Sequence, residues 1–375
     1  MEQVRQKGKG LGRRGKAAKI LRILCSVFLL LVILGTAVIE ILTLTEYRPQ
    51  EREILAVDHY GWDPIGTGES IKVLTWNCGY GALGDNADYF LDGGRGVRTA
   101  GDERVRSNLD GIIEASAGME PDVIFYQEVD ERAARSCRIN EVIRIANGFI
   151  ARYNSIYSTA YAYNLIVRYI PYPVPPIGDV RSGLMSLTGF RTDEAERIAL
   201  PCPFNWPLRL TDYKKCLLLE RLPLENSEKE LVLINLHMDA FDSDEAKTEQ
   251  TQALVQIMRE EVEKGNYVIA GGDFDQTFNN VDLSAYPLQD GVWKPGEIDT
   301  AQFGEDFLCL MDGSTPTCRS LDKPYAGADP ESFQYYVIDG FIVSSNIDVR
   351  LCETRDLGFV YSDHNPVLME CSLRP

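Results

Sequence analysis

The feature that most limits the possible folds is a series of short runs, rich in β-branched and aromatic residues, after position 70. Runs of this length and composition are typical of buried or half-buried strands. Two stretches between them, 102–117 and 244–264, carry apolar residues at helical spacing. The predicted strands span residues 71–77, 122–129, 183–190, 215–222, 230–238, 267–274, 336–344 and 365–373. Strands mixed with helices in this way predict an α/β fold.

Three connections between these elements are too long for simple turns, namely 82–101, 147–180 and 276–335. Connections of this length favour loops that cover one end of a sheet sandwich. Tyrosines are frequent between positions 153 and 172, and PYPVPP follows them. They leave three interpretations open: a substrate groove, contact with a membrane interface, or ordinary packing.

The N-terminus differs from the rest of the chain. Residues 1–22 contain eight Lys and Arg against a single acid, and residues 23–39 contain no charge. The apolar character continues to Leu44, and a membrane-spanning helix needs about 20 apolar residues. The alternative is a cleaved signal peptide, with an apolar core of about 7 to 15 residues and a small-x-small cleavage site. The Gly-Thr-Ala at 35–37 resembles such a site, but more apolar residues follow it, which favours an uncleaved signal anchor.

These observations predict four parts. Residues 1–22 form a basic flank that stays in the cytoplasm, because Lys and Arg beside a span resist translocation. Residues 23–44 form a transmembrane signal anchor, 45–70 a polar tether, and 71–375 the folded domain. The chain is therefore expected in the cell membrane as a single-pass protein, with its N-terminus cytoplasmic and its C-terminal domain extracytoplasmic.

The formal net charge is −18, but the residues after Arg22 carry 30 basic and 55 acidic side chains, a net of −25. A domain this acidic disfavours loose, nonspecific binding to nucleic acid phosphates. Its cysteines leave two interpretations open. Cys202 with Cys216, and Cys309 with Cys318, are close enough in sequence for disulfides, which an oxidising exterior permits. Buried free thiols are the alternative.

Polar residues stand where the predicted strands end. They are Asn77, Glu128, His237, Asp273 with Asp275, Asp339, and Asp363 with His364. A lone Asp or Asn after a strand usually caps a turn. The joint pattern indicates more, because a two-layer sheet fold gathers such ends on one rim and two of the three histidines are among them. The third, His59, lies in the predicted tether.

Carboxylates gathered on one rim repel one another, so their clustering itself implies a bound cation. Hydrolysis of a phosphodiester needs an in-line water, a cation beside the phosphoryl oxygens and proton transfer at both ends. Carboxylates and two histidines supply these requirements.

The same residues carry a family resemblance. The motifs are, in order, Trp76-Asn77, Gln127-Glu128, Leu236-His237, Gly272-Asp273-Phe274, Asp339-Gly340 and Ser362-Asp363-His364. This set, spread over residues 71–375, resembles the endonuclease/exonuclease/phosphatase superfamily, which includes deoxyribonuclease I, neutral sphingomyelinases and inositol polyphosphate 5-phosphatases. The resemblance implies a four-layer α/β/β/α sandwich, here with one N-terminal transmembrane helix.

The resemblance also implies roles. Glu128 is the expected principal ligand of Mg²⁺ or Mn²⁺, with Asn77 and Asp363 beside it. Asp273 is expected to orient or deprotonate the attacking water. His364, paired with Asp339, is expected to contact the scissile phosphate or exchange its proton. His237 is a candidate general acid for the leaving oxygen. Asn77, Asp275 and His237 are the expected phosphate contacts.

One position departs from the family pattern. Relatives usually carry Asn where this chain has Asp275, and an ionised Asp cannot donate a hydrogen bond to phosphate or water. Asp275 therefore binds a second cation, stays protonated, or weakens activity. The last possibility leaves open a catalytically weakened or inactive domain that only binds phosphate ligands.

The sequence thus predicts a membrane-anchored, divalent-metal-dependent phosphoester hydrolase acting outside the cytoplasm, as a phosphodiesterase, nuclease or phosphatase. A phospholipid, a nucleic acid and a small phosphodiester all remain possible substrates. No obligate protein partner is implied.

Overall fold

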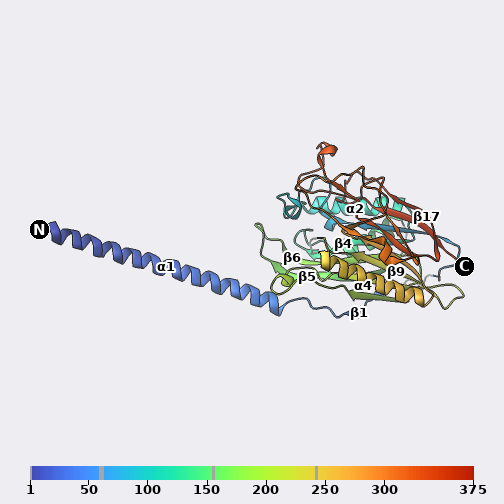
Figure 1. Cartoon of the computed structure of the whole chain (residues 1–375), viewed down its shortest axis with the longest axis horizontal. Helices are drawn as coiled ribbons and strands as arrows, with labels where there is room; N and C mark the ends of the chain where they lie inside the picture. The colour runs from blue at the N-terminus through green and yellow to red at the C-terminus, as the bar shows by residue number, and fades with distance from the viewer. Residues whose placement is uncertain (1, 59–62, 154–156, 241–243) are drawn as a thin grey trace.

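The computed structural model describes residues 2–58, 63–153, 157–240 and 244–375. Two seven-stranded sheets form the centre of the folded domain (Figure 1). In spatial order the first sheet contains β1 (Arg52–Ile54), β7 (Glu194–Ala199), β8 (Cys216–Pro223), β9 (Glu230–His237), β10 (Tyr267–Asp273), β16 (Asp339–Ser344) and β13 (Phe307–Leu310). The second contains β17 (Ile347–Thr354), β18 (Val367–Leu373), β3 (Ser70–Asn77), β4 (Val123–Ala133), β6 (Gly178–Thr188), β5 (Ser158–Ile170) and β2 (Val57–Asp58).

The outer faces of the sheets are covered by α2 (Asp102–Gly118), α3 (Glu141–Tyr153) and α4 (Asp244–Glu263) (Figure 1). Helix α1 (Glu2–Leu44) lies outside these layers. Buried side chains of α2 and α3 pack on the second sheet, and those of α4 pack on the first. A third apolar cluster lies between the sheets. These layers confirm the predicted four-layer α/β/β/α sandwich.

The central strands read as unbroken apolar runs because both of their faces are covered. In β3, Ile71 and Val73 face the other sheet, whereas Leu74 and Trp76 face the helices. Alternate side chains of a strand point to opposite faces, so a strand between two covered faces needs apolar residues at nearly every position. The polar residue that ends the run, Asn77, therefore marks the edge of the sandwich.

The connections predicted for 147–180 and 276–335 contain more regular structure than the sequence indicated. Most of the first connection is α3 and the 13-residue strand β5. Two small two-stranded sheets lie in or beside the second: β11 (Gln276–Phe278) with β12 (Gly296–Ile298), and β14 (Cys318–Arg319) with β15 (Tyr335–Tyr336). The tyrosines in β5 alternate with small and apolar residues, and this alternation is the strand signal that the sequence analysis overlooked.

Residues 45–70, predicted to be a tether, contribute to both sheets. Within them, β1 pairs with β7 and β2 pairs with β5, and Ile65 forms a bridge to Leu224. This part of the chain therefore belongs to the folded domain rather than hanging free of it. His59 lies outside the described residues.

The nine cysteines all lie in the described residues, and all are free. The two disulfides that the sequence left open, Cys202–Cys216 and Cys309–Cys318, are not formed. Cys216 and Cys318 are buried, which agrees with the alternative of buried free thiols.

Helix α1 runs away from the domain as one long helix (Figure 1). Its segment Ala18–Leu44 is long and apolar enough to cross a membrane. Its end touches the domain at few points. Leu42 packs against β5 and β6, and the indole Nε1 of Trp206 donates a hydrogen bond of 3.0 Å to Thr43 Oγ1.

Candidate active site

Three of the predicted residues form a row across the first sheet. In the strand register, Asp273 at the end of β10 stands opposite His237 on the parallel strand β9 and Asp339 on the antiparallel strand β16. Parallel neighbours end at the same edge, and an antiparallel neighbour begins there. The row is therefore a direct consequence of strand order.

The second sheet supplies the remaining residues of the predicted site. Asn77 ends β3, and Asp363 and His364 precede β18, which is antiparallel to β3. Glu128 lies in β4, where the register is irregular between Tyr126 and Val129. Its φ is +55°, a left-handed value uncommon outside glycine. Gln127 points between the sheets towards Asn235, so simple alternation would aim Glu128 at the helices. The irregular backbone instead places it on the wall of the pocket.

Side chains from both sheets lie around Asp273, which is 1% exposed. Its Oδ2 accepts a 2.9 Å hydrogen bond from Asn77 Nδ2. The same oxygen lies 3.8 Å from Nε2 of His237 and 3.7 Å from Nε2 of His364. The structure thus brings together residues that are far apart in the sequence and that come from both sheets.

His364 is held by a carboxylate. Its Nδ1 lies 2.8 Å from Oδ2 of Asp339, and both side chains are buried. Burial opposes the charged imidazole, but Asp339 and other neighbouring groups, Asp273 among them, together outweigh it and raise the pKa of His364 well above its usual value. Burial in turn raises the pKa of Asp339 to about 7, against the opposing charge of His364.

His237 is held differently. Its Nε2 lies 3.0 Å from Oδ2 of Asp275, the residue that departs from the family pattern. Its buried Nδ1 has no hydrogen-bond partner among the described residues and lies 4.0 Å from Glu128 Oε1. Burial, followed by the charge of Lys215, lowers the pKa of His237 to about 3. Burial raises the pKa of Asp275.

The carboxylates fit a divalent cation. Burial and the neighbouring charge of Asp363 raise the pKa of Glu128 to about 8, and burial raises that of Asp363. Buried carboxylates that disfavour their own ionisation need a positive partner, and oxygen donors suit Mg²⁺ or Mn²⁺.

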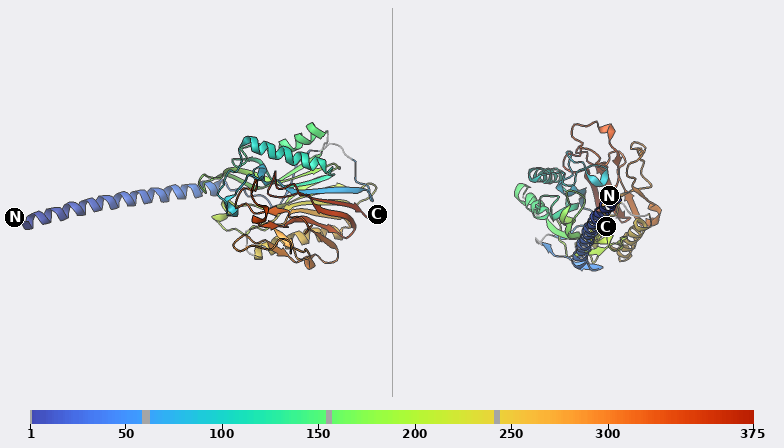
Figure 2. Two further views of the ribbon diagram at one scale, coloured as in Figure 1. Left: turned by 90° about the horizontal axis from the view of Figure 1, so that it is seen from above. Right: turned by 90° about the vertical axis from the view of Figure 1, so that its left-hand side faces the viewer.

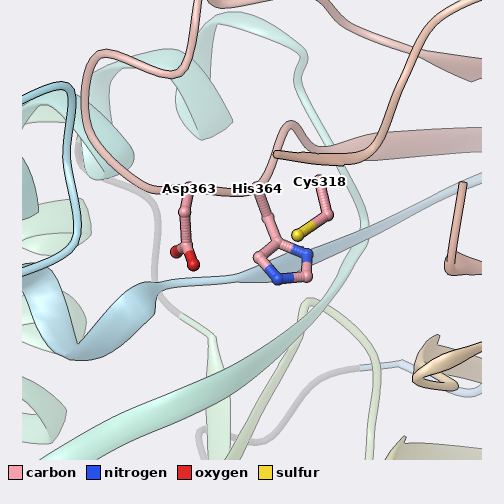
Figure 3. Close-up of side chains that lie close together, drawn as sticks. All are labelled: Cys318, Asp363 and His364. Atoms are coloured by element: carbon pink, nitrogen blue, oxygen red, sulfur yellow. The ribbon is translucent and has the colours of Figure 1, made fainter. Parts of the chain in front are cut away.

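A cysteine lies beside these groups. In Figure 3 the sulfur of Cys318 lies against the His364 ring, and Asp363 extends in the same general direction as His364. Cys318, Asp363 and His364 are close enough to share a metal ion. Burial raises the pKa of the Cys318 thiol to about 12, which keeps it protonated, and thiols are poor ligands of hard cations. We therefore assign it no ligand role.

The cluster lines a pocket of about 790 Å³. The lining also includes the apolar side chains of Leu165, Ile170, Ile177 and Val180, from β5, β6 and the turn between them. The pocket therefore combines charged and apolar side chains.

Lys215 is a pocket residue that the sequence analysis missed. It is 5% exposed and immediately precedes β8, whose first residues pair with the last residues of β9. Strand β8 is antiparallel to β9, so its start lies at the same rim as His237. A basic residue directly before an apolar run is the signal that could have identified it. Its ammonium can bind a phosphoryl oxygen at this rim.

Comparison with known proteins agrees with this architecture. No family model matches the chain, and no curated protein matches it. An endonuclease/exonuclease/phosphatase from Beutenbergia cavernae DSM 12333 matches with a TM-score of 0.53 at 16% identity, covering 81% of this chain and 72% of that one. A family protein from Leptotrichia buccalis C-1013-b matches with a TM-score of 0.52 at 14% identity, covering 81% of this chain and 100% of that one. The chain therefore has the endonuclease/exonuclease/phosphatase fold.

Proposed function

We propose that this chain is a membrane-anchored phosphoester hydrolase that depends on Mg²⁺ or Mn²⁺ and acts outside the cytoplasm. The observation that carries the proposal is the convergence on Asp273. One of its oxygens lies within 4 Å of an amide and two imidazoles, beside buried carboxylates from the opposite sheet. No single motif of the sequence contains this arrangement, and its chemistry suits transfer of a phosphoryl group to water.

Glu128 and Asp363 would hold the cation, with Asn77 close by. When bound, the cation would neutralise charge that develops on the phosphoryl oxygens. Asn77 also has a second task in this structure, since its Nδ2 donates to Asp273 and its Oδ1 accepts from the backbone N–H of Gly79. We therefore assign it chiefly to positioning Asp273.

Asp273 is the residue that we assign to the attacking water. Its Oδ1 accepts a 2.9 Å hydrogen bond from the backbone N–H of Asp275, and its Oδ2 accepts from Asn77. Both oxygens are thus fixed by donors that do not themselves take up protons. A carboxylate held in this way can orient a water molecule and accept its proton as the new bond to phosphorus forms.

The proton for the leaving oxygen comes, in this proposal, from His364. Asp339 holds its Nδ1, while its Nε2 lies 3.7 Å from Asp273, beyond hydrogen-bond length. The resemblance favours His237 for this role, but its Nε2 is already engaged by Asp275. We assign His237 and Lys215 to binding the phosphoryl group.

The anchor is the N-terminal helix. The span Ala18–Leu44 fits either a membrane anchor or a signal sequence by its length and composition. We favour an anchor because Leu42 and Thr43 make specific contacts with the domain, which a cleaved peptide would lose. The basic residues before the span would keep the N-terminus in the cytoplasm.

The test is hydrolysis of bis(p-nitrophenyl) phosphate, plasmid DNA and sphingomyelin by the detergent-solubilised full chain. We expect turnover of at least one substrate with Mg²⁺ or Mn²⁺ and none after removal of the metal with EDTA. Glu128→Gln should abolish turnover and weaken cation binding measured by calorimetry. Glu131→Gln is the matched control, because Glu131 is a partly exposed residue of the same strand, paired with Arg181 at the surface.

Metal binding without turnover of any substrate would favour the alternative, a domain that binds phosphate ligands without catalysis. Absence of both metal binding and turnover would overturn the proposal.

A further inference from the structure

The end of α1 fixes the height of the domain above the bilayer. From Ile23 to Leu44 the helix has 22 residues, which at 1.5 Å each extend about 33 Å, close to the thickness of the hydrocarbon core. Thr43 therefore lies at the outer boundary of the hydrocarbon. Since Trp206 donates a hydrogen bond to Thr43, the loop that carries Trp206 is held at the same level.

The candidate active site faces the same side of the domain. Strand β18 begins beside His364 and ends at Leu373, next to the C-terminus. The C-terminus lies at the end of the domain opposite α1, as both Figure 1 and the left view of Figure 2 show. The start of β18, and with it the row of polar strand ends, therefore lies at the end of the domain from which α1 leaves.

That end of the domain exposes large apolar side chains. We call this set the apolar rim: Tyr169, Tyr172, Val174, Trp206 and Leu208, which are 52%, 54%, 95%, 53% and 68% exposed. Tyr169 lies near the end of β5, Tyr172 and Val174 lie in the loop that joins β5 to β6, and Trp206 and Leu208 lie in the segment that precedes β8. The loop and the segment are tied together by a 2.9 Å hydrogen bond between the hydroxyls of Tyr172 and Thr211. Tyr and Trp at such a level are typical of membrane–water interfaces.

The apolar rim adjoins the pocket. Tyr172 belongs to the rim and also lines the pocket. Leu165 and Val180 of the pocket wall pack in one cluster with Leu42 of α1. Apolar side chains of β5 and β6 thus contact the anchor helix and line the same pocket as Asp273 and His364.

We propose that the apolar rim inserts into the outer leaflet and that the pocket takes its substrate from that leaflet, as a lipid phosphoester. This inference rests on the proposed function and adds its substrate class. The phosphoester lies at Asp273 and His364, and the adjoining apolar part of the lipid lies against Leu165, Ile170 and Val180. Water adds to phosphorus, the bond from phosphorus to the leaving oxygen breaks, and that oxygen takes a proton to leave as an alcohol.

The charge distribution argues against a nucleic acid in the same pocket. The residues after Arg22 carry a net charge of −25, which repels a polyanion. The single phosphate of a lipid carries far less charge than a nucleic acid, so the acidic domain repels it much less. The apolar part of the lipid also suits a pocket that is lined by apolar as well as charged side chains.

The first test measures insertion without reference to activity. The full chain is placed in nanodiscs of phosphatidylcholine with brominated acyl chains, which quench tryptophan emission at short range. We expect Trp206 to be quenched, so Trp206→Phe should remove most of the quenched part of the emission. Trp293→Phe is the control, because Trp293 is a half-buried residue that packs against Tyr336 and does not belong to the apolar rim. Equal quenching in wild type and Trp206→Phe would overturn the insertion.

The second test compares two substrates on one protein. Val174→Asp combined with Leu208→Asp places charge on the apolar rim, at two exposed positions that do not line the pocket. We expect hydrolysis of lipids in the nanodisc, from a panel of phosphatidylcholine, phosphatidylglycerol and sphingomyelin, to fall about tenfold. Hydrolysis of soluble bis(p-nitrophenyl) phosphate should stay within about twofold of wild type. Ile143→Asp, at a residue that is 58% exposed on α3, is the matched control and should change neither rate.

The outcomes separate the two proposals. Loss of both hydrolyses in the wild-type chain contradicts the proposed function itself. Hydrolysis of the soluble diester without hydrolysis of any lipid in the panel leaves the proposed function standing and overturns the lipid inference. Equal loss of soluble and lipid hydrolysis in the double variant also overturns the lipid inference. The substitutions would then have damaged the fold rather than membrane insertion.

Discussion

His237 and His364 both lie close to the carboxylate of Asp273, but they are held through different ring nitrogens and their pKa values are shifted in opposite directions. His237 comes from the first sheet and His364 precedes a strand of the second, and both Nε2 atoms lie within 4 Å of Asp273 Oδ2. Asp339 holds His364 through Nδ1 and raises its pKa, whereas His237 is held through Nε2 and its pKa falls to about 3 through burial and the charge of Lys215.

The difference shows that the atom by which a buried imidazole is held matters as much as its position. A carboxylate on Nδ1 fixes the tautomer and leaves Nε2 directed at the pocket. A carboxylate on Nε2 removes that nitrogen from the reaction. Two histidines that look equivalent in the sequence therefore support different tasks, and substitutions at each should separate them.

The largest expected effect is the loss of His364. His364→Ala should lower kcat/KM for a soluble diester by about 10³-fold, the usual contribution of a proton-transferring group, whereas His237→Ala should lower it by about tenfold. Steady-state kinetics of the two variants side by side measure the contrast. Cation binding, followed by calorimetry, should persist in both. A larger loss in His237→Ala would reverse the assignment of roles.

The second effect concerns the partner of His364. Asp339→Asn keeps the shape of the side chain and removes its charge, so it should lower kcat by about 10–100-fold. Because the Asp339 carboxylate raises the pKa of His364, its removal should also move the limb of the pH–rate profile that reports the protonated imidazole to lower pH. A purely structural role would lower the rate without moving that limb.

Substitution of Asp275, the partner of His237, should raise kcat rather than lower it. Asp275 has a φ of +51°, a conformation that Asn tolerates as well as Asp, so Asp275→Asn should leave the backbone in place. Its new amide can donate to phosphate, and we expect kcat to rise by about threefold. A fall comparable with that of Asp339→Asn would show that the two carboxylates do equivalent work, and the comparison between the histidines would fail.

The smallest expected effect comes from a buried acid outside the site. Glu220 of β8 is fully buried, and this burial raises its pKa to about 7. The unfolded chain releases this proton near pH 4.5 and the folded chain only near 7, so stability falls as pH rises between these values. The contribution is about 3 kcal/mol.

Glu220→Gln should remove this slope. Urea unfolding in detergent, at one pH below 4.5 and one above 7, gives the free energy of unfolding of variant and wild type. The difference should grow in favour of Gln at the higher pH. A constant difference would mean that burial does not raise the pKa of Glu220 in the folded chain.

Much of the fold was predictable because its signals are local. Central strands covered on both faces must be apolar at nearly every position, so β3 and β10 were visible as continuous runs. Helix α2 shows the spacing of one buried face. In contrast, β5 has alternating tyrosines, and β1 and β2 have only three and two residues, too few for any pattern.

The sequence predicted which residues form the site better than it predicted how they are arranged. Polar residues at strand ends, such as Asn77 and His237, stand out because the sandwich interior excludes them. Lys215 did not stand out, since its place at the rim follows from the antiparallel pairing of β8 with β9. The hydrogen bond between Asp275 and His237 likewise joins residues 38 positions apart.

By itself, the sequence determined the layered α/β class, the apolar N-terminal helix and the residues gathered at the site, because each of these features imposes a composition on a short stretch of chain. Only the tertiary structure decided which nitrogen of each histidine is held, how Glu128 turns into the pocket, and that the apolar rim, the end of helix α1 and the site share one end of the domain. These properties arise from strand order and packing between distant segments. A linear pattern carries no record of which segments meet.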